Sequence, residues 1–320
     1  MAGYQIQEYT ENMDFKDYLV KDLNLDESKV TYYKTAKAVA FWYKGYLFVV
    51  DGEDMEIKCM GGDVIKQYYW LGKLSAVMYE DLMDDGKIVV EVKRKPEYGF
   101  LSGYEEKVKV VIHSNELETA RYLGYCKNLE NAYLSENTKN LNRWTFSNCE
   151  NLKKIVLPET VTEIGDEAFL KCKNLKKINL PNGLTSLGSG AFNGCSSLEG
   201  IGKIPDGITV INSYVFADCS KLNIMLTENI TEIGVNAFTH INLDAFYIPR
   251  SVTNVGANAF SYASIKKVYY GGSQTEWDAI EGAGHGNIQM VGAVIYYFSE
   301  TRPESTGNYW HYVNGSITEW

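Results

Sequence analysis

The sequence has little of what catalysis and metal binding require. Histidine occurs only four times in 320 residues, as His113, His240, His285 and His311, and none has an acid or a thiol at a recognised motif spacing. The nucleophile motif G-x-S-x-G, the phosphate-binding motif G-x-x-x-x-G-K-[ST], the zinc motif H-E-x-x-H and the EF-hand loop are also missing. We therefore predict no catalytic residue, no cofactor-binding residue and no metal ligand, and we expect a protein that is not an enzyme.

Long apolar runs and a surplus of basic residues are missing as well. No stretch approaches the roughly 18 consecutive apolar residues of a membrane span, and the start MAGYQIQEYTENMDF lacks the parts of a signal peptide. Lys and Arg number 31 against 41 Asp and Glu, which gives a net charge of −10. Binding to nucleic acid or anionic lipid depends on clustered Lys and Arg. We expect neither partner, no membrane insertion, and either an intracellular protein or the processed form of a secreted one.

What the sequence does have is a period. Five of its six cysteines follow one another at intervals of 23, 23, 23 and 24 residues: Cys126, Cys149, Cys172, Cys195 and Cys219. Three residues before each of the last four stands a phenylalanine: Phe146, Phe169, Phe192 and Phe216. A period of this length is typical of stacked repeats, in which each unit buries its apolar face only against its neighbours. We therefore expect an extended surface for binding rather than a pocket for chemistry.

Each repeat is predicted to contain two short extended pieces and a turn. Residues 146–168 and 169–191 share the pattern F-x-x-C-x-x-L-x-x-I-x-L-P-x-x-(V/L)-T-x-(I/L)-G-x-x-A, while 192–215 carry one inserted residue and 216–237 lose one. L-x-x-I-x-L predicts a strand, the Pro a turn, V-T-x-I-G a second extended piece, and G-x-x-A-F-x-x-C a short helical or 3₁₀ turn. Successive strands are expected to pair in parallel and to build a curved sheet with the turns opposite.

This pattern resembles the repeat of the BspA-like leucine-rich repeat proteins of gut and oral bacteria. The motif AFxxCxxLxxIxLPxxVTxIG matches over residues 122–270. The segments VYYGGSQTEWDAI and IYYFSETRPESTGNYWHYVNGSITEW look like the ending of many members, which extends the match to about residue 320. The resemblance implies a right-handed leucine-rich solenoid with a parallel sheet on its concave face. For several members it also implies adhesion or host-surface contact, and a secreted or cell-surface location.

Three parts are expected along the chain. They are an α+β domain of no recognised family over residues 1–112, an array of about six or seven repeats of 22–24 residues over 113–270, and a C-terminal β cap over 271–320. In the first part, DFKDYLVKDL at 14–23 predicts a helix, and apolar runs around a Lys44-Gly45 turn predict antiparallel strands. In the last part, Ser273 and Glu276 form a capping-box pattern ahead of a short helix, and Asn314-Gly315 predicts a hairpin.

Three arrangements are open for the cysteine row. The first is a column of free thiols inside the solenoid, because Cys behaves as a small buried apolar residue. The second is disulfides between coils, since parallel strands lie about 4.8 Å apart and a disulfide needs a Cα separation near 5.5 Å. Five in a row cannot all pair, however, and Cys59 lies in another segment. The third, a zinc site, needs ligands that converge from several directions. We favour buried thiols that form a structural core with the phenylalanines.

The binding surface is expected on the concave sheet, among the residues that flank the inward Leu and Ile of each strand. The candidates are Tyr133, Lys154, Lys177, Asn179, Met225, Tyr247, Lys267 and Tyr269. Rings, amides and cations on one continuous face suit a protein or carbohydrate ligand. A merely solvated sheet face is the alternative, and the convex turns or the first domain could equally carry the contact.

These observations favour a non-enzymatic binding or adhesion protein whose repeat face recognises a protein or glycan partner. Two other functions remain open. In one, the N-terminal domain is an effector or an enzyme and the repeats are its targeting arm. In the other, the chain is a structural component of a phage tail or a secretion assembly.

Overall fold

The structure is a computed structural model of the whole chain. It describes residues 30–33, 38–43, 46–51, 56–61, 64–70, 73–80, 87–92, 100–113, 118–282, 292–304 and 306–320. For the strands between residues 30 and 80, and for Ile88 and Glu91, the description covers the backbone only. The predicted helix over 14–23 and the predicted Lys44-Gly45 turn lie outside the described residues.

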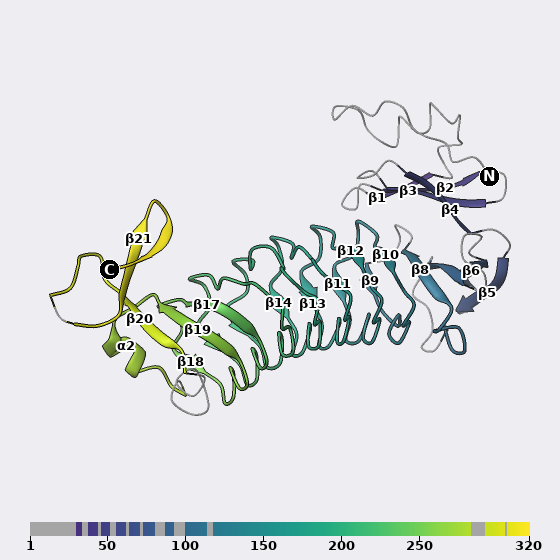
Figure 1. Cartoon of the computed structure of the whole chain (residues 1–320). Helices are drawn as coiled ribbons and strands as arrows, with labels where there is room; N and C mark the ends of the chain where they lie inside the picture. The colour runs from purple at the N-terminus through teal and green to yellow at the C-terminus, as the bar shows by residue number, and fades with distance from the viewer. Residues whose placement is uncertain are drawn as a thin grey trace.

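The first described part of the chain is built of β-strands (Figure 1). One antiparallel sheet contains, in chain order, β1 (Val30–Tyr33), β2 (Ala38–Tyr43), β3 (Tyr46–Asp51) and β4 (Glu56–Gly61). A second antiparallel run contains β5 (Val64–Trp70), β6 (Lys73–Glu80) and β7 (Ile88–Val92). β7 then pairs in parallel with β8 (Val108–His113), so this run continues into the sheet of the repeats. The predicted domain boundary after residue 112 falls inside β8, and the division into domains stays a prediction.

From β8 onward the chain winds into a right-handed β-solenoid of about eight turns, with parallel strands and almost no helix. The concave sheet contains β8, β10 (Asn131–Tyr133) and β12 (Lys154–Val156), and further along β17 (Asn242–Ile248) and β19 (Ser264–Tyr270). A second stack has two-residue strands: β9 (Thr119–Ala120), β11 (Asn140–Leu141), β13 (Glu163–Ile164), β14 (Ser186–Leu187), β15 (Val210–Ile211), β16 (Glu232–Ile233) and β18 (Asn254–Val255). Glu163 pairs with Ser186, one repeat later in the sequence. The predicted parallel stack is confirmed.

Stacked phenylalanine rings fill the core of the solenoid. Neighbouring rings in the series Phe146, Phe169, Phe192, Phe216, Phe238 and Phe260 lie between 5.2 and 5.9 Å apart, measured between centroids, and all are buried. Beside them runs a column of buried, unpaired thiols: Cys126, Cys149, Cys172, Cys195 and Cys219. The Cys195 thiol donates a hydrogen bond to the Phe169 carbonyl oxygen, 3.1 Å away in the preceding coil, and the same contact recurs in other coils. Equal spacing in the sequence thus places equal side chains on top of one another.

The turns opposite the concave sheet differ from the prediction. The Leu170 amide donates to the Glu167 carbonyl oxygen at 3.1 Å, the three-residue separation of a 3₁₀ turn. Glu167 and Lys171, however, have φ angles of 53° and 57°. A right-handed 3₁₀ helix needs negative φ throughout. The segment is therefore a run of overlapping β-turns, and the predicted short helical or 3₁₀ turn is wrong. An apolar spacing of three to four residues is common to both conformations, so the pattern does not separate them.

The same turns carry a chain of hydrogen bonds along the solenoid axis. The Phe146 amide donates to the Ala168 carbonyl oxygen at 2.7 Å, and the Phe169 amide donates to the Ala191 carbonyl oxygen at 2.8 Å. The Ala168 carbonyl and the Phe169 amide belong to one peptide unit, which thus accepts from the coil before it and donates to the coil after it. The series continues to Ala259. Buried backbone groups need such partners, and here the neighbouring coils supply them.

The C-terminal segment extends the concave sheet and then returns along it. β20 (Val294–Phe298) pairs in parallel with β19, and β21 (Tyr309–Val313) in parallel with β20. β22 (Ser316–Glu319) pairs antiparallel with β21 and closes the C-terminal hairpin, residues 309–319. The short helix α2 (Gln274–Asp278) begins after Ser273, whose capping box with Glu276 is present. Trp310 of β21 is buried, and its indole Nε1 donates to the Tyr270 carbonyl oxygen at 2.8 Å.

Candidate binding face

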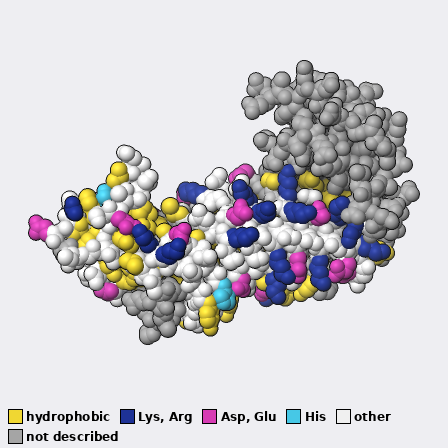
Figure 2. Space-filling model, in the orientation of Figure 1, with side chains coloured by type: hydrophobic (Ala, Val, Ile, Leu, Met, Phe, Trp, Pro, Cys, Tyr) yellow, Lys and Arg dark blue, Asp and Glu magenta, His cyan; other side chains and the backbone are white. Residues whose placement is uncertain are grey.

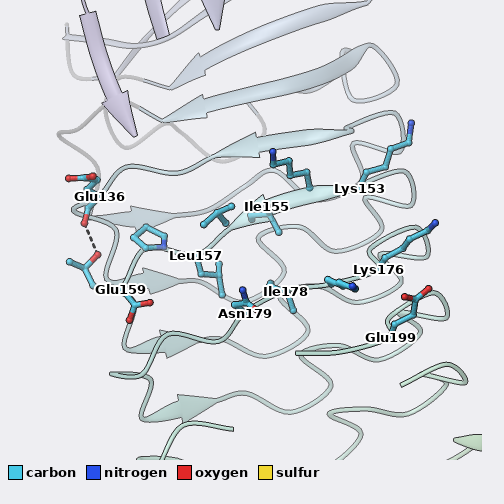
Figure 3. A pocket seen from close by; sticks show the side chains of 14 residues that line it. Glu136, Lys153, Ile155, Leu157, Glu159, Lys176, Ile178, Asn179 and Glu199 are labelled. Carbon is cyan, nitrogen blue, oxygen red and sulfur yellow. Dashed lines mark hydrogen bonds between the residues drawn. The ribbon is translucent and has the colours of Figure 1, made fainter. Parts of the chain in front are cut away.

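Three of the predicted binding residues line a groove on the concave sheet. Lys154, Lys177 and Asn179 border a space of about 1110 Å³ (Figure 3). The walls come from two successive coils, residues 153–160 and 176–179, with one glutamate from each adjoining coil. Lys177 and Asn179 are exposed, and Lys154 is half-buried. The repeat therefore brings together side chains that lie 23 or 25 residues apart in the sequence.

Charge is distributed unevenly along this groove. Figure 3 shows Glu136 and Glu159 at one end and Lys153 and Lys176 at the other, with Asn179 between them. Glu199 lies at the lysine end, so that end carries charge of both signs. In Figure 2 dark blue side chains form a row over the middle of the solenoid, mixed with magenta ones. Such an arrangement favours a ligand that carries charges of both signs along its length.

The lysines of the groove differ in whether they form an ion pair with a carboxylate of the protein. Lys153 lies 3.2 Å from the Glu130 carboxylate, measured from Nζ to Oε2. Lys176 and Lys177 form no ion pair with any residue that the structure describes. These two ammonium groups are thus available to an external carboxylate or hydroxyl group, at a site where few protein groups compete.

The two concave backbone segments that form the groove, β12 and residues 176–180, are not paired as strands. β12 is the last strand of its sheet, although the next coil continues the stack. Lys177 forms only an isolated bridge, with Gly200. Among the described residues, no backbone hydrogen bond joins β12 to residues 176–180. The two coils are joined on either side of this stretch, where the Asn174 amide donates to the Glu150 carbonyl oxygen at 3.0 Å and the Thr185 amide donates to the Thr162 carbonyl oxygen at 2.9 Å. No strand can be added between them, so the groove offers a ligand mainly side-chain contacts.

The C-terminal part of the predicted face is covered by the C-terminal hairpin. Glu319 of β22 accepts hydrogen bonds from Lys267 Nζ and from the Tyr269 hydroxyl, each at 2.5 Å. The Trp310 ring meets Tyr247 and Tyr269 edge-on, with centroids 5.8 and 6.0 Å apart. These three candidates are therefore occupied by a contact within the chain.

The remaining candidates divide by exposure. Tyr133 and Tyr247 are buried, and the Tyr247 hydroxyl donates to the Glu228 carboxylate. Met225 is exposed but lies outside the groove. Of the eight residues, only Lys154, Lys177 and Asn179 are gathered in one accessible place.

Where the C-terminal hairpin covers the sheet, the pKa values of the contacting side chains are shifted in directions that favour the contact. Burial raises the pKa of Tyr247 and of Tyr269, and the neighbouring Glu228 and Glu319 carboxylates raise them further. Hydrogen bonds from Lys267 and Tyr269 lower the pKa of Glu319, while the bond to Glu319 raises the pKa of Lys267. Near neutral pH the carboxylate is therefore charged, the tyrosines are neutral and the lysine is protonated, which is the combination that holds the hairpin to the sheet.

The buried thiols of the column have low reactivity. Burial raises the pKa of Cys149 to about 12 and raises those of Cys126, Cys172 and Cys219 as well. A thiol that stays protonated is a poor nucleophile and a poor metal ligand. No group of three or more His, Cys, Asp or Glu side chains suited to a metal ion occurs in the described part of the chain. Within the same residues, no helix has the length and apolar character to cross a membrane.

The sequence did not point to the residues that complete the groove or to those that cover the rest of the face. Glu136, Glu159 and Glu199 stand at loop positions next to the strands, where a repeat pattern gives no direction for a side chain. Glu319 and Trp310 reach the sheet only because the hairpin turns back, and their partners Lys267 and Tyr270 lie 52 and 40 residues away.

Comparison with known proteins gives one family. Six copies of the BspA type leucine rich repeat region match residues 115–222 and 202–279. A search of curated proteins found no match.

Several solved structures are similar to this chain. A leucine-rich repeat protein from Bacteroides ovatus has a TM-score of 0.51 and 21% identity, over 75% of this chain and 72% of that one. The leucine-rich repeat protein of T. pallidum has a TM-score of 0.40 and 23% identity, over 48% of this chain and 81% of that one. A leucine rich cell surface protein from Faecalibacterium prausnitzii has a TM-score of 0.39 and 16% identity, over 76% of this chain and 97% of that one.

Proposed function

Because this chain belongs to the BspA-type leucine-rich repeat proteins, we propose that it is a non-enzymatic binding protein whose concave face holds an extended segment of a protein partner. The groove at Lys154, Lys177 and Asn179 is the observation that carries this proposal. It is the place where accessible predicted residues lie beside Lys176 and Lys177, which have no ion-pair partner among the described residues.

A polypeptide fits the groove better than a neutral sugar does. An extended peptide can carry side chains of both signs, which reach the two differently charged ends of the groove. An acidic side chain of the ligand would meet Lys176 and Lys177, and a basic one would meet Glu136 and Glu159. Because the stacked coils fix these groups in advance, little conformational entropy is lost on binding.

A screen followed by mutation tests this function. The full chain would be screened against immobilised serum and extracellular-matrix proteins and against a glycan array. The Lys177→Ala, Asn179→Ala double variant is then measured against each protein that binds. We expect at least a tenfold loss of affinity, equal to about 1.4 kcal/mol. Circular dichroism and thermal unfolding should stay unchanged, since both side chains are exposed.

The matched control is Lys203→Ala, which removes the same charge from an exposed lysine that pairs with Asp206 at 2.9 Å outside the groove. This variant should bind as the unmodified chain does. Equal affinity of the double variant and the control would contradict a concave binding site. Binding to glycans alone would contradict a protein partner. The affinities of the double variant and of the control for those glycans would then test whether the concave face is the binding site.

A further inference from the structure

The turn side of the first two described coils carries exposed aromatic rings in a strained backbone conformation. Tyr122, Tyr125 and Trp144 have φ angles of 64°, 67° and 59°. Tyr125 is 63% exposed and Trp144 is 49% exposed. Left-handed φ costs a residue with a side chain roughly 1–2 kcal/mol, whereas Gly, and to a lesser degree Asn, adopts it readily. Equivalent turn positions in other coils hold Asn or Gly in some cases and other residues in others. The first group is Asn148, Gly190, Gly194, Asn236 and Asn258, and the second is Glu167, Lys171, Tyr214, Asp218, His240 and Tyr262.

Burial does not offset that cost for the most exposed rings. A ring that leaves about half or more of its surface in water recovers only part of the hydrophobic gain of a core aromatic. Positive φ recurs at these turn positions from coil to coil, so the fold requires it, and Asn or Gly would adopt it with less strain than an aromatic residue. The aromatic residues at these turns are thus better explained by a surface role than by stability.

The rings are held in place by arginines. The Arg143 guanidinium carbon lies 4.1 Å from the Trp144 ring centroid, and that of Arg121 lies 5.5 Å from the Tyr122 centroid. The Trp144 indole Nε1 donates to Glu167 Oε2 at 3.0 Å, which fixes the ring from the neighbouring coil. The two Arg–aromatic pairs occupy the same place in successive coils, so they form one continuous patch.

This patch has more positive than negative charge. Arg143 lies 3.6 Å from the Glu167 carboxylate, from NH2 to Oε1, a loose ion pair. Arg121 forms no ion pair with any residue that the structure describes, and its Nε is buried without a hydrogen-bond partner. The patch therefore has a guanidinium group with no ion-pair partner among the described residues, near the exposed ring of Tyr125.

We propose that this patch, Arg121, Tyr122, Tyr125, Arg143 and Trp144, binds a carbohydrate chain that carries carboxylate groups. The C–H face of a pyranose ring packs on Tyr125 or Trp144, and its hydroxyl groups stay in water. A uronate carboxylate accepts paired hydrogen bonds from a guanidinium, the geometry in which arginine is most effective. The patch lies on the turns, away from the concave groove, so it is a second site and does not depend on the function proposed above.

Two substitutions separate a binding role from a structural one. Tyr125→Asn and Trp144→Asn introduce the residue that other coils already use at left-handed turn positions. The fold should therefore keep its melting temperature or gain slightly. Affinity of the full chain for hyaluronan or polygalacturonate oligosaccharides, measured by isothermal titration calorimetry, should fall at least tenfold. Chitohexaose, which has no carboxylate, serves as the neutral probe and should bind at least tenfold more weakly to the unmodified chain.

Tyr214→Asn is the matched control, because Tyr214 is also exposed with a φ of 60° but lies further along the solenoid. It should leave oligosaccharide affinity unchanged. Arg121→Gln should weaken the uronate probes and leave the chitohexaose value as it was. The proposal is overturned if neither acidic oligosaccharide binds, if chitohexaose binds as tightly as they do, or if Trp144→Asn retains full affinity. A fall in melting temperature of Trp144→Asn without loss of binding would assign the ring to stability instead.

Discussion

Replacement of Phe192 by alanine tests whether the phenylalanine stack holds the coils together. The ring is fully buried between Phe169 and Phe216, at centroid distances of 5.2 and 5.9 Å. A buried phenylalanine contributes about 150 Å² of apolar area, which at about 25 cal/mol per Å² corresponds to about 4 kcal/mol. Measured Phe→Ala substitutions in cores cost about 3–5 kcal/mol. We expect Phe192→Ala to lower the free energy of unfolding by about 4 kcal/mol.

Urea unfolding followed by circular dichroism measures this loss. With a slope of about 2–3 kcal/mol per molar urea, the midpoint should fall by roughly 1.5–2 M. The control Phe192→Leu keeps most of the apolar contact but loses two ring contacts, each contributing about 0.5–1.5 kcal/mol. It should cost about 1–3 kcal/mol. A loss below about 1 kcal/mol for Phe192→Ala, or equal losses for the two variants, would refute the view that stacked rings in successive coils stabilise the solenoid.

Three further outcomes are expected. Hydrogen bonds, including one from Lys267, lower the pKa of Glu319. The Glu319 carboxylate therefore stabilises docking of the C-terminal hairpin at neutral pH. This stabilisation is lost as the pH falls through the lowered pKa, below about 4.5. Protection of the β22 amides against hydrogen exchange, corrected for the intrinsic pH dependence of exchange, should fall below that pH in the unmodified chain and should be low and independent of pH in Glu319→Gln. Cys149, with its pKa near 12, should resist iodoacetamide at pH 8 in the folded chain and react after unfolding, as mass spectrometry would show; labelling of the folded chain would contradict its burial. Gly165→Ala should cost about 2 kcal/mol or more, since a Cβ there would lie 2.7 Å from the Arg143 backbone nitrogen, and an unchanged melting temperature would contradict this close approach of coils.

The sequence predicts the stack because one physical requirement repeats in every coil. Phe169 and Phe192 recur at the same spacing as Cys172 and Cys195, and only a parallel stack buries all of them at once. The conformation of the turns could not be predicted in this way. Glu167 is neither Gly nor Asn, so nothing in its identity indicates the positive φ that it adopts.

The repeat pattern predicts which side chains lie on the candidate face, but it does not predict which other segments of the chain cover that face. Alternation along a strand indicates which side chains leave the core, and it places Lys177 and Asn179 on the open face as the structure does. It contains no information on what lies above that face. Tyr269 occupies an outward position of its strand, yet its hydroxyl is bonded to Glu319 at 2.5 Å, because a hairpin 50 residues away returns to it.

The hydrogen-bond chain through the turns gives this one edge of the solenoid an electric polarity, while the N–H groups of Gly165 and Gly188 in the second strand stack point the opposite way. Each peptide unit carries a dipole of about 3.5 D, and those at Phe146, Phe169 and later turns all direct their N–H groups toward the C-terminal coils. The dipoles therefore add along this edge, with the positive pole at the C-terminal end, the opposite sense to an α-helix. The guanidinium groups of Arg121 and Arg143 lie at the first coils, which is the negative pole, where a cation is most stable.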